Sequence, residues 1–349
     1  MKKINHNELK FVLKHNAKQN KAVGVLGRTG IGKSWVIKEV AQELAKELGR
    51  KFVEWNNLSL EEKRKVVEGG EDYYVFVDFR LSQITPEDLR GLPKLGDKGV
   101  EWKPNLWALA LNKNAGCLFF DEFNLALPSI QATIYQILLD RQIGEIPLHA
   151  DVFVVLAGNV LEDKAGTYDI PKPIRTRISL FELQIPNEEE LIDFGIKHNW
   201  DSRVLAFLKT RPSYVFKEKN EDVISPRGWH FVSDLIKGKE DLEEIELLAS
   251  GILGEGGAIE FVSFVKLREK IPDVWEILEG KKEIPDEIDL KYAVISEIVE
   301  AYRKHDKKRE EIIKKIFRNI EGTLEAEFFV FLLRTVKGID VDFLSFNPA

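Results

Sequence analysis

Short apolar runs alternate with helix-like patterns along the first 185 residues. The runs are continuous in Val, Leu and Phe, which is typical of strands that are buried on both faces of a parallel sheet. They occupy residues 22–26, 73–79, 117–120, 152–157 and 178–183. The pattern therefore predicts an α/β fold whose core is a five-stranded parallel sheet between helices.

The segment after the first predicted strand has the pattern of an amphipathic helix. Val36, Val40, Leu44 and Leu48 recur at helical spacing, and Gly49 follows as the residue that ends the helix. The start of this helix therefore lies just beyond the end of the first strand.

The pattern changes at residue 187, after which helix starts and helical periodicity occur without convincing strands. Asn187 and Glu190 form a capping-box sequence, and Ser225 followed by Pro226 is a typical helix start. Near Asp289 a further helix is predicted from four residues on one face, Tyr292, Ile295, Val299 and Tyr302. This part of the chain is therefore predicted to be a separate, helical region.

The composition is that of an ordinary globular protein, with 44% hydrophobic and 31% charged residues. Lys plus Arg number 51 against 58 Asp plus Glu, which gives a net charge of −7. This charge disfavours binding of nucleic acid or anionic lipid by the surface as a whole, and a local basic patch is the alternative. Cys117 is the single cysteine, and residues 1–7 lack the apolar stretch of a secretory signal. No stretch approaches the roughly 18 to 20 apolar residues of a membrane span. We therefore expect a cytoplasmic protein without a membrane span.

The loop between the first strand and its helix has the strongest signal for chemistry. Residues 27–34 read Gly-Arg-Thr-Gly-Ile-Gly-Lys-Ser, which satisfies the phosphate-loop pattern G-x-x-x-x-G-K-[ST] between a strand and a helix. In such a loop the backbone N–H groups and the helix N-terminus face phosphate, while Lys33 adds positive charge and Ser34 a ligand for Mg²⁺. The alternative is an ordinary glycine turn. The residues predicted to bind ATP are Gly27, Thr29, Gly30, Ile31, Gly32, Lys33, Ser34 and Trp35.

The predicted strand at residues 117–120 ends in two adjacent acids, Asp121 and Glu122. This arrangement resembles a Walker B element, in which Asp121 would support the magnesium shell and Glu122 would polarise the water that attacks the terminal phosphate. Acidic residues at a strand end are common, so the interpretation depends on the phosphate loop. Cys117, inside the same apolar run, is predicted to be a core residue and not a nucleophile.

Two more polar residues are candidates for the same site. Asn159 follows the predicted strand at 152–157, where the alternative is an Asn in a turn. Arg227 lies at the start of a predicted helix, where a cation gains nothing from the helix N-terminus, so a phosphate partner competes with the interpretation of a solvated arginine. The apolar face predicted for that helix consists of Phe231, Val232, Leu235 and Ile236.

The ordered series of motifs resembles the MoxR-type AAA+ ATPases, a family of ring-forming, chaperone-like machines. The resemblance covers about residues 8 to 270. It rests on the phosphate loop at 27–34, the segments 88–93 and 121–124, Gln131, and the segments 140–142, 157–159, 170–177 and 225–227.

The resemblance implies a role for each matching residue. Asn159 corresponds to sensor 1, Arg177 to the arginine finger offered to a neighbouring subunit's nucleotide, and Arg227 to sensor 2. Arg177 lies in Thr-Arg-Ile, where the family usually has Asp-Arg-Phe or Asn-Arg-Phe, so Arg175 remains an alternative. Two hairpins that face the centre of the ring are implied near residues 99–103 and 142–148. Trp102 and Trp107 could contact a partner, and the alternative interpretation is that they are buried aromatic residues.

The resemblance also implies the organisation and activity of the whole chain. The chain is expected to divide into an AAA+ P-loop NTPase core at residues 1–185, a helical lid at 186–270 and an additional C-terminal helical region at 271–349. Such a protein forms a ring, expected to be a hexamer, that hydrolyses ATP with Mg²⁺ and remodels a protein client, usually one with a von Willebrand factor A domain. The alternatives are a nucleic-acid-stimulated motor, which the net charge disfavours, and a nucleotide-gated scaffold with incidental turnover, which Glu122 disfavours.

Overall fold

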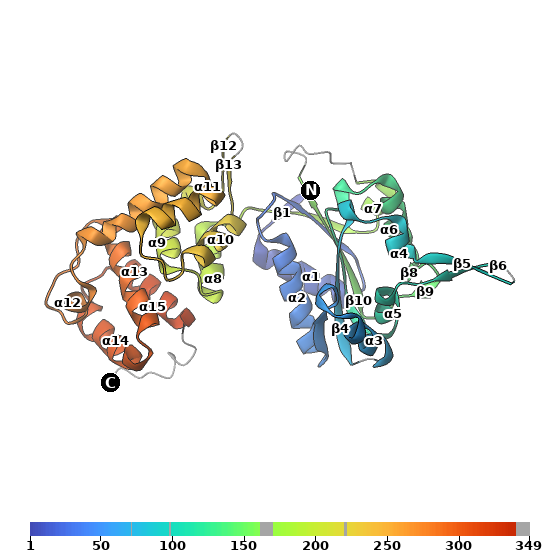
Figure 1. Cartoon of the computed structure of the whole chain (residues 1–349), viewed down its shortest axis with the longest axis horizontal. Coiled ribbons are helices and arrows are strands. Elements are labelled where there is room, and N and C mark those ends of the chain that lie inside the picture. Colours follow the sequence, from blue (N-terminus) through green and yellow to red (C-terminus); the bar gives the residue numbers. More distant parts are fainter. Residues whose placement is uncertain (71, 98, 161–169, 220–221, 340–349) are drawn as a thin grey trace. The chain divides into compact units, whose positions relative to one another are not determined.

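The computed structural model of the chain describes residues 1–70, 72–97, 99–160, 170–219 and 222–339 (Figure 1). The chain falls into two compact units, Met1–Ile185 and Pro186–Ala349. Residues 340–349 of the predicted C-terminal region lie outside the described residues. Each unit is described by itself.

The first unit is built on a seven-stranded parallel sheet with the order β1-β11-β2-β10-β7-β4-β3. Its strands are β1 (Lys2–Ile4), β11 (Ser179–Leu183), β2 (Val23–Gly27), β10 (Val152–Asn159), β7 (Ala115–Asp121), β4 (Tyr73–Arg80) and β3 (Lys51–Glu54). The five inner strands are the five that the sequence predicts. The edge strands β1 and β3 were not predicted because they are three and four residues long and contain charged residues.

Helices cover both faces of this sheet (Figure 1). Helices α1 (His6–Lys18) and α2 (Lys33–Glu47) lie on one face, and α3 (Leu60–Glu68), α5 (Leu106–Lys113) and α6 (Pro128–Asp140) lie on the other. The second face is closed by a cluster in which Val77, Leu118 and Ile134 are fully buried. An α/β fold with a parallel sheet between helices is therefore confirmed.

Both hairpins expected in the first unit are present. Strands β5 (Leu92–Gly96) and β6 (Gly99–Lys103) form one, and β8 (Gln142–Ile143) and β9 (Ile146–Pro147) the other. All described residues of β5 and β6 are exposed, and this hairpin extends away from the sheet (Figure 1). Trp102 lies on it and is 43% exposed, whereas Trp107 of α5 is buried and donates its indole N–H to the Asp88 carbonyl at 3.1 Å.

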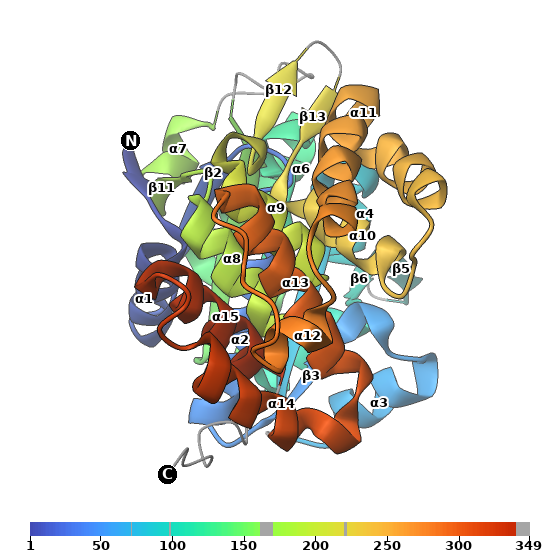
Figure 2. The same ribbon diagram turned by 90° about the vertical axis from the view of Figure 1, so that its left-hand side faces the viewer.

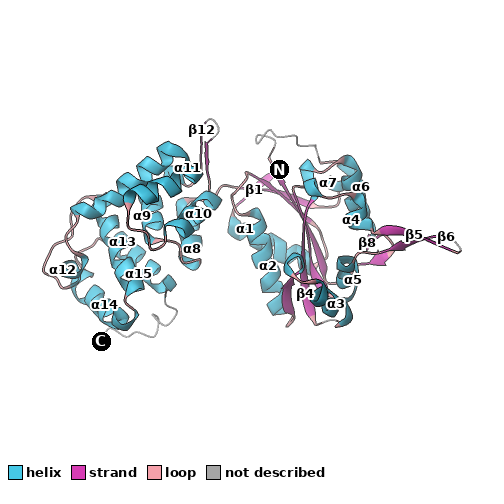
Figure 3. Ribbon diagram, viewed as in Figure 1, coloured by secondary structure: helices cyan, strands magenta, loops and turns pink. Residues whose placement is uncertain are grey.

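The second unit is mainly helical, as predicted, and its helices are coloured cyan in Figure 3. They are α8 (Glu188–Lys197), α9 (Ser202–Thr210), α10 (Pro226–Ile236), α11 (Leu242–Val265), α12 (Val274–Leu278), α13 (Ile288–Lys304), α14 (Arg309–Lys315) and α15 (Ala326–Ile339). The capping box of Asn187 with Glu190 and the N-cap at Ser225 are both formed. A short hairpin of β12 (Lys217–Lys219) and β13 (Asp222–Ile224) was not predicted.

Helix α13 lies at the centre of this unit, packed against α9, α12 and α15 (Figure 2). Its predicted apolar face is buried, and one hydrophobic cluster runs from Leu191 to Val336. The boundary near residue 270 stays a prediction.

The buried face of helix α10 differs from the predicted one. Val232 and Ile236 are buried as expected, but Phe231 and Leu235 are 50% and 44% exposed, and Trp229 takes their place in the core. Trp229 also donates its indole N–H to the Tyr214 carbonyl at 2.7 Å, and this bond fixes the rotation of the helix.

Helix α11 and the residues after it, Leu242–Lys270, are long and apolar enough to cross a membrane by length and composition alone. The expectation that no stretch reaches this threshold was therefore wrong. The helix kinks at Gly254, which has φ 73°, and its buried residues belong to the core of the second unit. A core helix passes the same test of length and composition.

Candidate functional site

The carboxyl end of β2 leads through a tight loop into α2. Gly32 has φ 98°, a conformation that other residues rarely adopt. At Gly27, a Cβ would lie 2.8 Å from Cδ1 of Ile31 and 3.1 Å from the Leu183 carbonyl oxygen. Glycine at these positions therefore lets the loop close over the start of the helix.

The loop encloses the ammonium group of Lys33, whose side chain is only 7% exposed. Its Nζ donates to the carbonyl oxygens of Gly27 and Arg28, each at 2.8 Å, and to Oδ1 of Asn159 at 3.2 Å. Because a buried charge is costly without hydrogen-bond partners, these three bonds stabilise the closed conformation of the loop. The third bond connects the loop to β10.

The next residue contacts a different strand. The Ser34 hydroxyl donates to Oδ2 of Asp121, at the end of β7, at 2.9 Å, and Oδ1 of Asp121 accepts the Glu122 N–H at 2.8 Å. A hydroxyl and a carboxylate are oxygen ligands of the kind that Mg²⁺ prefers, and the first-turn N–H groups of α2 are suited to phosphate. These residues therefore fit a magnesium–nucleotide complex.

The described residues contain no cluster of three or more His, Cys, Asp or Glu that would hold a metal ion without other ligands. Mg²⁺ commonly binds through one or two carboxylates together with water and the phosphates of a nucleotide. The oxygen donors of Ser34 and Asp121 fit that class of site.

Glu122 has an unusual backbone conformation. Its φ of 56° and ψ of 33° fall in the left-handed region, which costs a non-glycine residue of the order of 1 kcal/mol or more and is common at functional sites. Its carboxylate accepts a hydrogen bond from the Ser82 hydroxyl, on the short helix η2 (Leu81–Gln83) after β4. Ser82 was not singled out in the sequence, because it is 40 residues away from Glu122 and lies in no motif.

Asn124, on η3 (Phe123–Leu125), connects the acid-bearing strand to β10. Its side-chain amide donates to the Asn159 carbonyl at 2.7 Å, and its Oδ1 accepts the Asn159 N–H at 3.0 Å. A Cβ on Gly158 would lie 2.6 Å from that Oδ1, which explains the glycine before Asn159. The backbone of Asn159 is thus fixed, and its side chain faces Lys33.

A histidine also contacts the loop, although nothing in the sequence indicates it. His6, in the first turn of α1, places Nε2 2.8 Å from the Ile31 carbonyl oxygen. A carbonyl accepts, so the imidazole donates from Nε2 in this arrangement.

The remaining predicted residues lie elsewhere. Arg177 places its guanidinium 4.7 Å from the ring centroid of Tyr135 and donates to the Pro173 carbonyl at 2.8 Å. Arg175, at the end of α7 (Lys172–Arg175), is exposed, and its side chain makes no hydrogen bond or ion pair with another described residue. Arg227 is exposed at the second residue of α10, in the second unit. Cys117 is buried, and burial raises the pKa of its thiol, as expected for a core residue.

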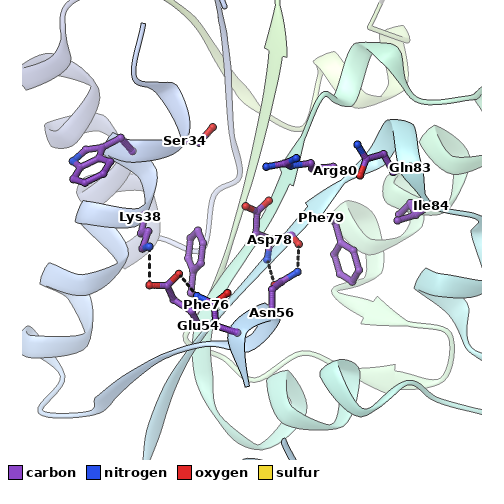
Figure 4. A pocket seen from close by; sticks show the side chains of 12 residues that line it. Ser34, Lys38, Glu54, Asn56, Phe76, Asp78, Phe79, Arg80, Gln83 and Ile84 are labelled. Carbon is purple, nitrogen blue, oxygen red and sulfur yellow. Dashed lines mark hydrogen bonds and ion pairs between the residues drawn. The ribbon is translucent and has the colours of Figure 1, made fainter. Parts of the chain in front are cut away.

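A cavity of about 660 Å³ lies beside Ser34, and Trp35 and Asp78 help to line it (Figure 4). Burial, followed by the nearby Asp121 carboxylate, raises the pKa of Asp78 to about 6, although Arg80 and Lys38 oppose this shift. A second acid is therefore present close to the predicted magnesium ligand.

We predict that Asn124→Ala lowers the free energy of unfolding by about 1 to 3 kcal/mol, because it leaves the partly buried N–H and carbonyl of Asn159 without their bonds to this side chain. Urea titration measures the change. Asn124→Asp keeps the acceptor but sets a carboxylate oxygen against the Asn159 carbonyl, so it should lose stability as well. Asn112→Ala is the control, since the side-chain bond that Asn112 donates to the Pro147 carbonyl is exposed to solvent. Equal losses for Asn124→Ala and Asn112→Ala would contradict the assignment.

The raised pKa of Asp78 predicts a pH-dependent effect of Asp78→Asn in EDTA. The folded state holds this proton up to about pH 6 and the unfolded state releases it near pH 4, so the carboxyl makes the protein less stable as the pH rises between these values. At pH 7.5 the variant should therefore be more stable than the wild type by about 1 kcal/mol, after allowing for partial exposure of the group. The difference should become smaller towards pH 4. A difference that is the same at both pH values, by urea titration, would disprove the pKa shift.

Comparison with known proteins gives matches among solved structures only; no family model and no curated protein matches the chain. A point mutant of RuvB from Thermotoga maritima is 15% identical over 79% of each chain, with a TM-score of 0.35. A candidate ATPase from Cytophaga hutchinsonii is 13% identical over 95% of this chain and 89% of that one, with a TM-score of 0.36. NtrX from Brucella abortus, in complex with ADP, is 15% identical over 98% of this chain and 65% of that one, with a TM-score of 0.33. At TM-scores this low, these likenesses do not assign a family or an activity to the chain.

Proposed function

We propose that the chain is an AAA+ ATPase that hydrolyses ATP at subunit junctions of a ring and remodels a protein partner. One observation carries the proposal: consecutive residues at the start of α2 contact the ends of two other strands. Lys33 is bonded to Asn159 of β10, and Ser34 to Asp121 of β7. Phosphoryl transfer depends mainly on positioning and charge stabilisation, and this edge of the sheet brings together the groups for both.

The roles follow from the chemistry of each group. The loop at residues 27–32, the N-terminus of α2 and Lys33 bind the phosphates of ATP, and Trp35 lies beside them in the same helical turn. Ser34 and Asp121 hold Mg²⁺, which neutralises phosphate charge when bound. Glu122 polarises the attacking water and is oriented by Ser82, whereas Asn159, fixed by Asn124, acts as sensor 1.

The assembly follows from the arginine finger, which acts outside its own subunit's site, whereas sensor 2 acts on the nucleotide of its own subunit. An arginine, Arg177 or Arg175, acts on the nucleotide of a neighbouring subunit, and Arg227 of the helical lid acts as sensor 2. A hexamer is the expected ring, in the cytoplasm, and a protein with a von Willebrand factor A domain is the expected client. The exposed β5–β6 hairpin is suited to contact that client through four apolar residues, Leu92, Leu95, Val100 and Trp102.

Two variants test the ATPase proposal. Lys33→Met should abolish nucleotide binding, because it removes the ammonium that the loop encloses. Glu122→Gln should bind ATP with unchanged affinity but lose at least about 100-fold in turnover, because the amide accepts from Ser82 yet cannot take a proton from water. Binding is measured with a fluorescent ATP analogue and turnover by phosphate release.

Lys46→Met is the matched control for Lys33→Met, since Lys46 lies exposed in the last turn of the same helix. The proposal fails if the wild type neither binds nor hydrolyses ATP, or if Lys33→Met and Lys46→Met behave alike.

The arginine finger is tested by Arg175→Ala and Arg177→Ala. Removing the finger should lower turnover by about 10³-fold or more while ATP binding is retained. Arg177 must leave the ring of Tyr135 to act on another subunit, whereas Arg175 is already exposed, so Tyr135→Leu should change turnover only if Arg177 is the finger. Mixing each variant with Lys33→Met subunits shows whether the arginine acts across the junction. If both arginine variants hydrolyse ATP normally, hydrolysis at a shared junction is disproved.

A further inference from the structure

The cavity beside Ser34 contains an acid that the proposed mechanism does not use. The walls of the cavity are the first turns of α2, the end of β4 and the segment after β3 (Figure 4). The carboxylate of Asp78 points into this space, towards the side on which Ser34 and Arg80 lie (Figure 4). Asp78 therefore faces the end of α2 where Ser34 and Asp121 meet.

The register of the sheet places Asp78 and Asp121 on the same face. In the parallel pair of β4 and β7, Asp78 is opposite Phe119 and Arg80 is opposite Asp121. Side chains alternate along a strand, so Phe76 and Asp78 share a face of β4, and Phe119 and Asp121 share a face of β7. The rings of Phe76 and Phe119 are 6.1 Å apart, which shows that the two faces coincide. This is the face that α2 covers, since Ser34 contacts Asp121.

The backbone of Asp78 is fixed, whereas one oxygen of its carboxylate has no hydrogen-bond partner among the described residues. The Asn56 side chain accepts the Asp78 N–H at 3.1 Å and donates to the Asp78 carbonyl at 2.8 Å, continuing the sheet edge where β3 ends. Oδ1 of Asp78 is buried without a hydrogen bond in the described part of the chain. Glu54, the other acid of the cavity, pairs with Lys38 at 2.7 Å and accepts from Asn57 at 3.1 Å. Only one of these two carboxylates is therefore already compensated.

We propose that Asp78 is a positioning residue for magnesium: its carboxylate accepts hydrogen bonds from hydration water of the cation that Ser34 and Asp121 hold. This inference rests on the proposed function. Mg²⁺ usually keeps several waters, and carboxylates that receive hydrogen bonds from the ligand shell of a metal typically change its affinity by about 10- to 100-fold. A buried, fixed carboxylate oxygen at the edge of the site is suited to that role.

The charge of Asp78 has a second consequence. Without a cation, a carboxylate beside the phosphate site repels nucleotide; with a cation, it stabilises the complex. Asp78 therefore couples the binding of nucleotide to the binding of Mg²⁺, and by linkage the coupling is the same in both directions. A residue with a purely structural role would change nucleotide affinity equally with and without the cation.

The test measures binding of a fluorescent ADP analogue in EDTA and across a Mg²⁺ titration, so that no turnover is involved. Asp78→Asn should raise the Mg²⁺ concentration at half-maximal binding about 10-fold, while affinity in EDTA is unchanged or higher. Asp78→Glu, which keeps the carboxylate, should restore part of the loss. Glu54→Gln is the matched control, because it removes a charge from the same cavity and should leave the Mg²⁺ midpoint within about 2-fold of the wild type.

Three results would overturn the inference: a wild-type Mg²⁺ midpoint in Asp78→Asn, an equal loss of affinity with and without Mg²⁺, or a shift in Glu54→Gln as large as that in Asp78→Asn. In each case the proposed function stands if the wild type binds nucleotide and Lys33→Met does not. If the wild type itself binds no nucleotide, the proposed function fails, and the role of Asp78 fails with it.

Discussion

The edge of the sheet that bears the site is organised around one buried ammonium group. Lys33 is 7% exposed, and an uncompensated charge at that depth would be costly. Its oxygen partners come from the loop that precedes it and from the last residue of β10. The same interaction therefore requires a closed loop and a sheet in which β10 lies next to β2, so the local conformation and the strand order depend on each other.

The strand order also explains why two consecutive residues of α2 reach different strands. Because β10 lies between β2 and β7, the helix crosses β10 and β7 as it leaves the loop. Lys33 then reaches Asn159, and Ser34 reaches Asp121. The Asn124 side chain connects the ends of β7 and β10 through two bonds to the backbone of Asn159, so the spacing between these contacts does not depend on a single loop. Rigid support of this kind is what positional catalysis requires.

The sequence predicts those elements whose signal is local. The five inner strands are continuous apolar runs because both faces of a parallel sheet are covered, and the capping box at Asn187 is complete within four residues. The edge strands and the β12–β13 hairpin were not predicted, since short polar strands acquire their conformation from a neighbour. The face of α10 was misassigned for the same reason. Helical spacing allows either rotation, and the contact of Trp229 with Tyr214 selects one.

The site shows the same division at the level of single residues. Lys33, Ser34 and Asp121 are predictable because motif spacing along the chain reports their chemistry. The supporting groups Ser82 and Asn124 make contacts between segments that are far apart in sequence, and the proposed role of Asp78 depends on strand register. Asp78 is the clearest example: it stands within an ordinary strand sequence, Tyr-Val-Phe-Val-Asp-Phe-Arg, as an isolated acid. The register with β7 shows that Asp78 shares a face of the sheet with Asp121. Glu54, the other acid of the cavity, is paired with Lys38, so the carboxylate without such a pair is that of Asp78. A buried carboxylate oxygen that has no hydrogen-bond partner among the described residues favours a partner that binds from outside the chain.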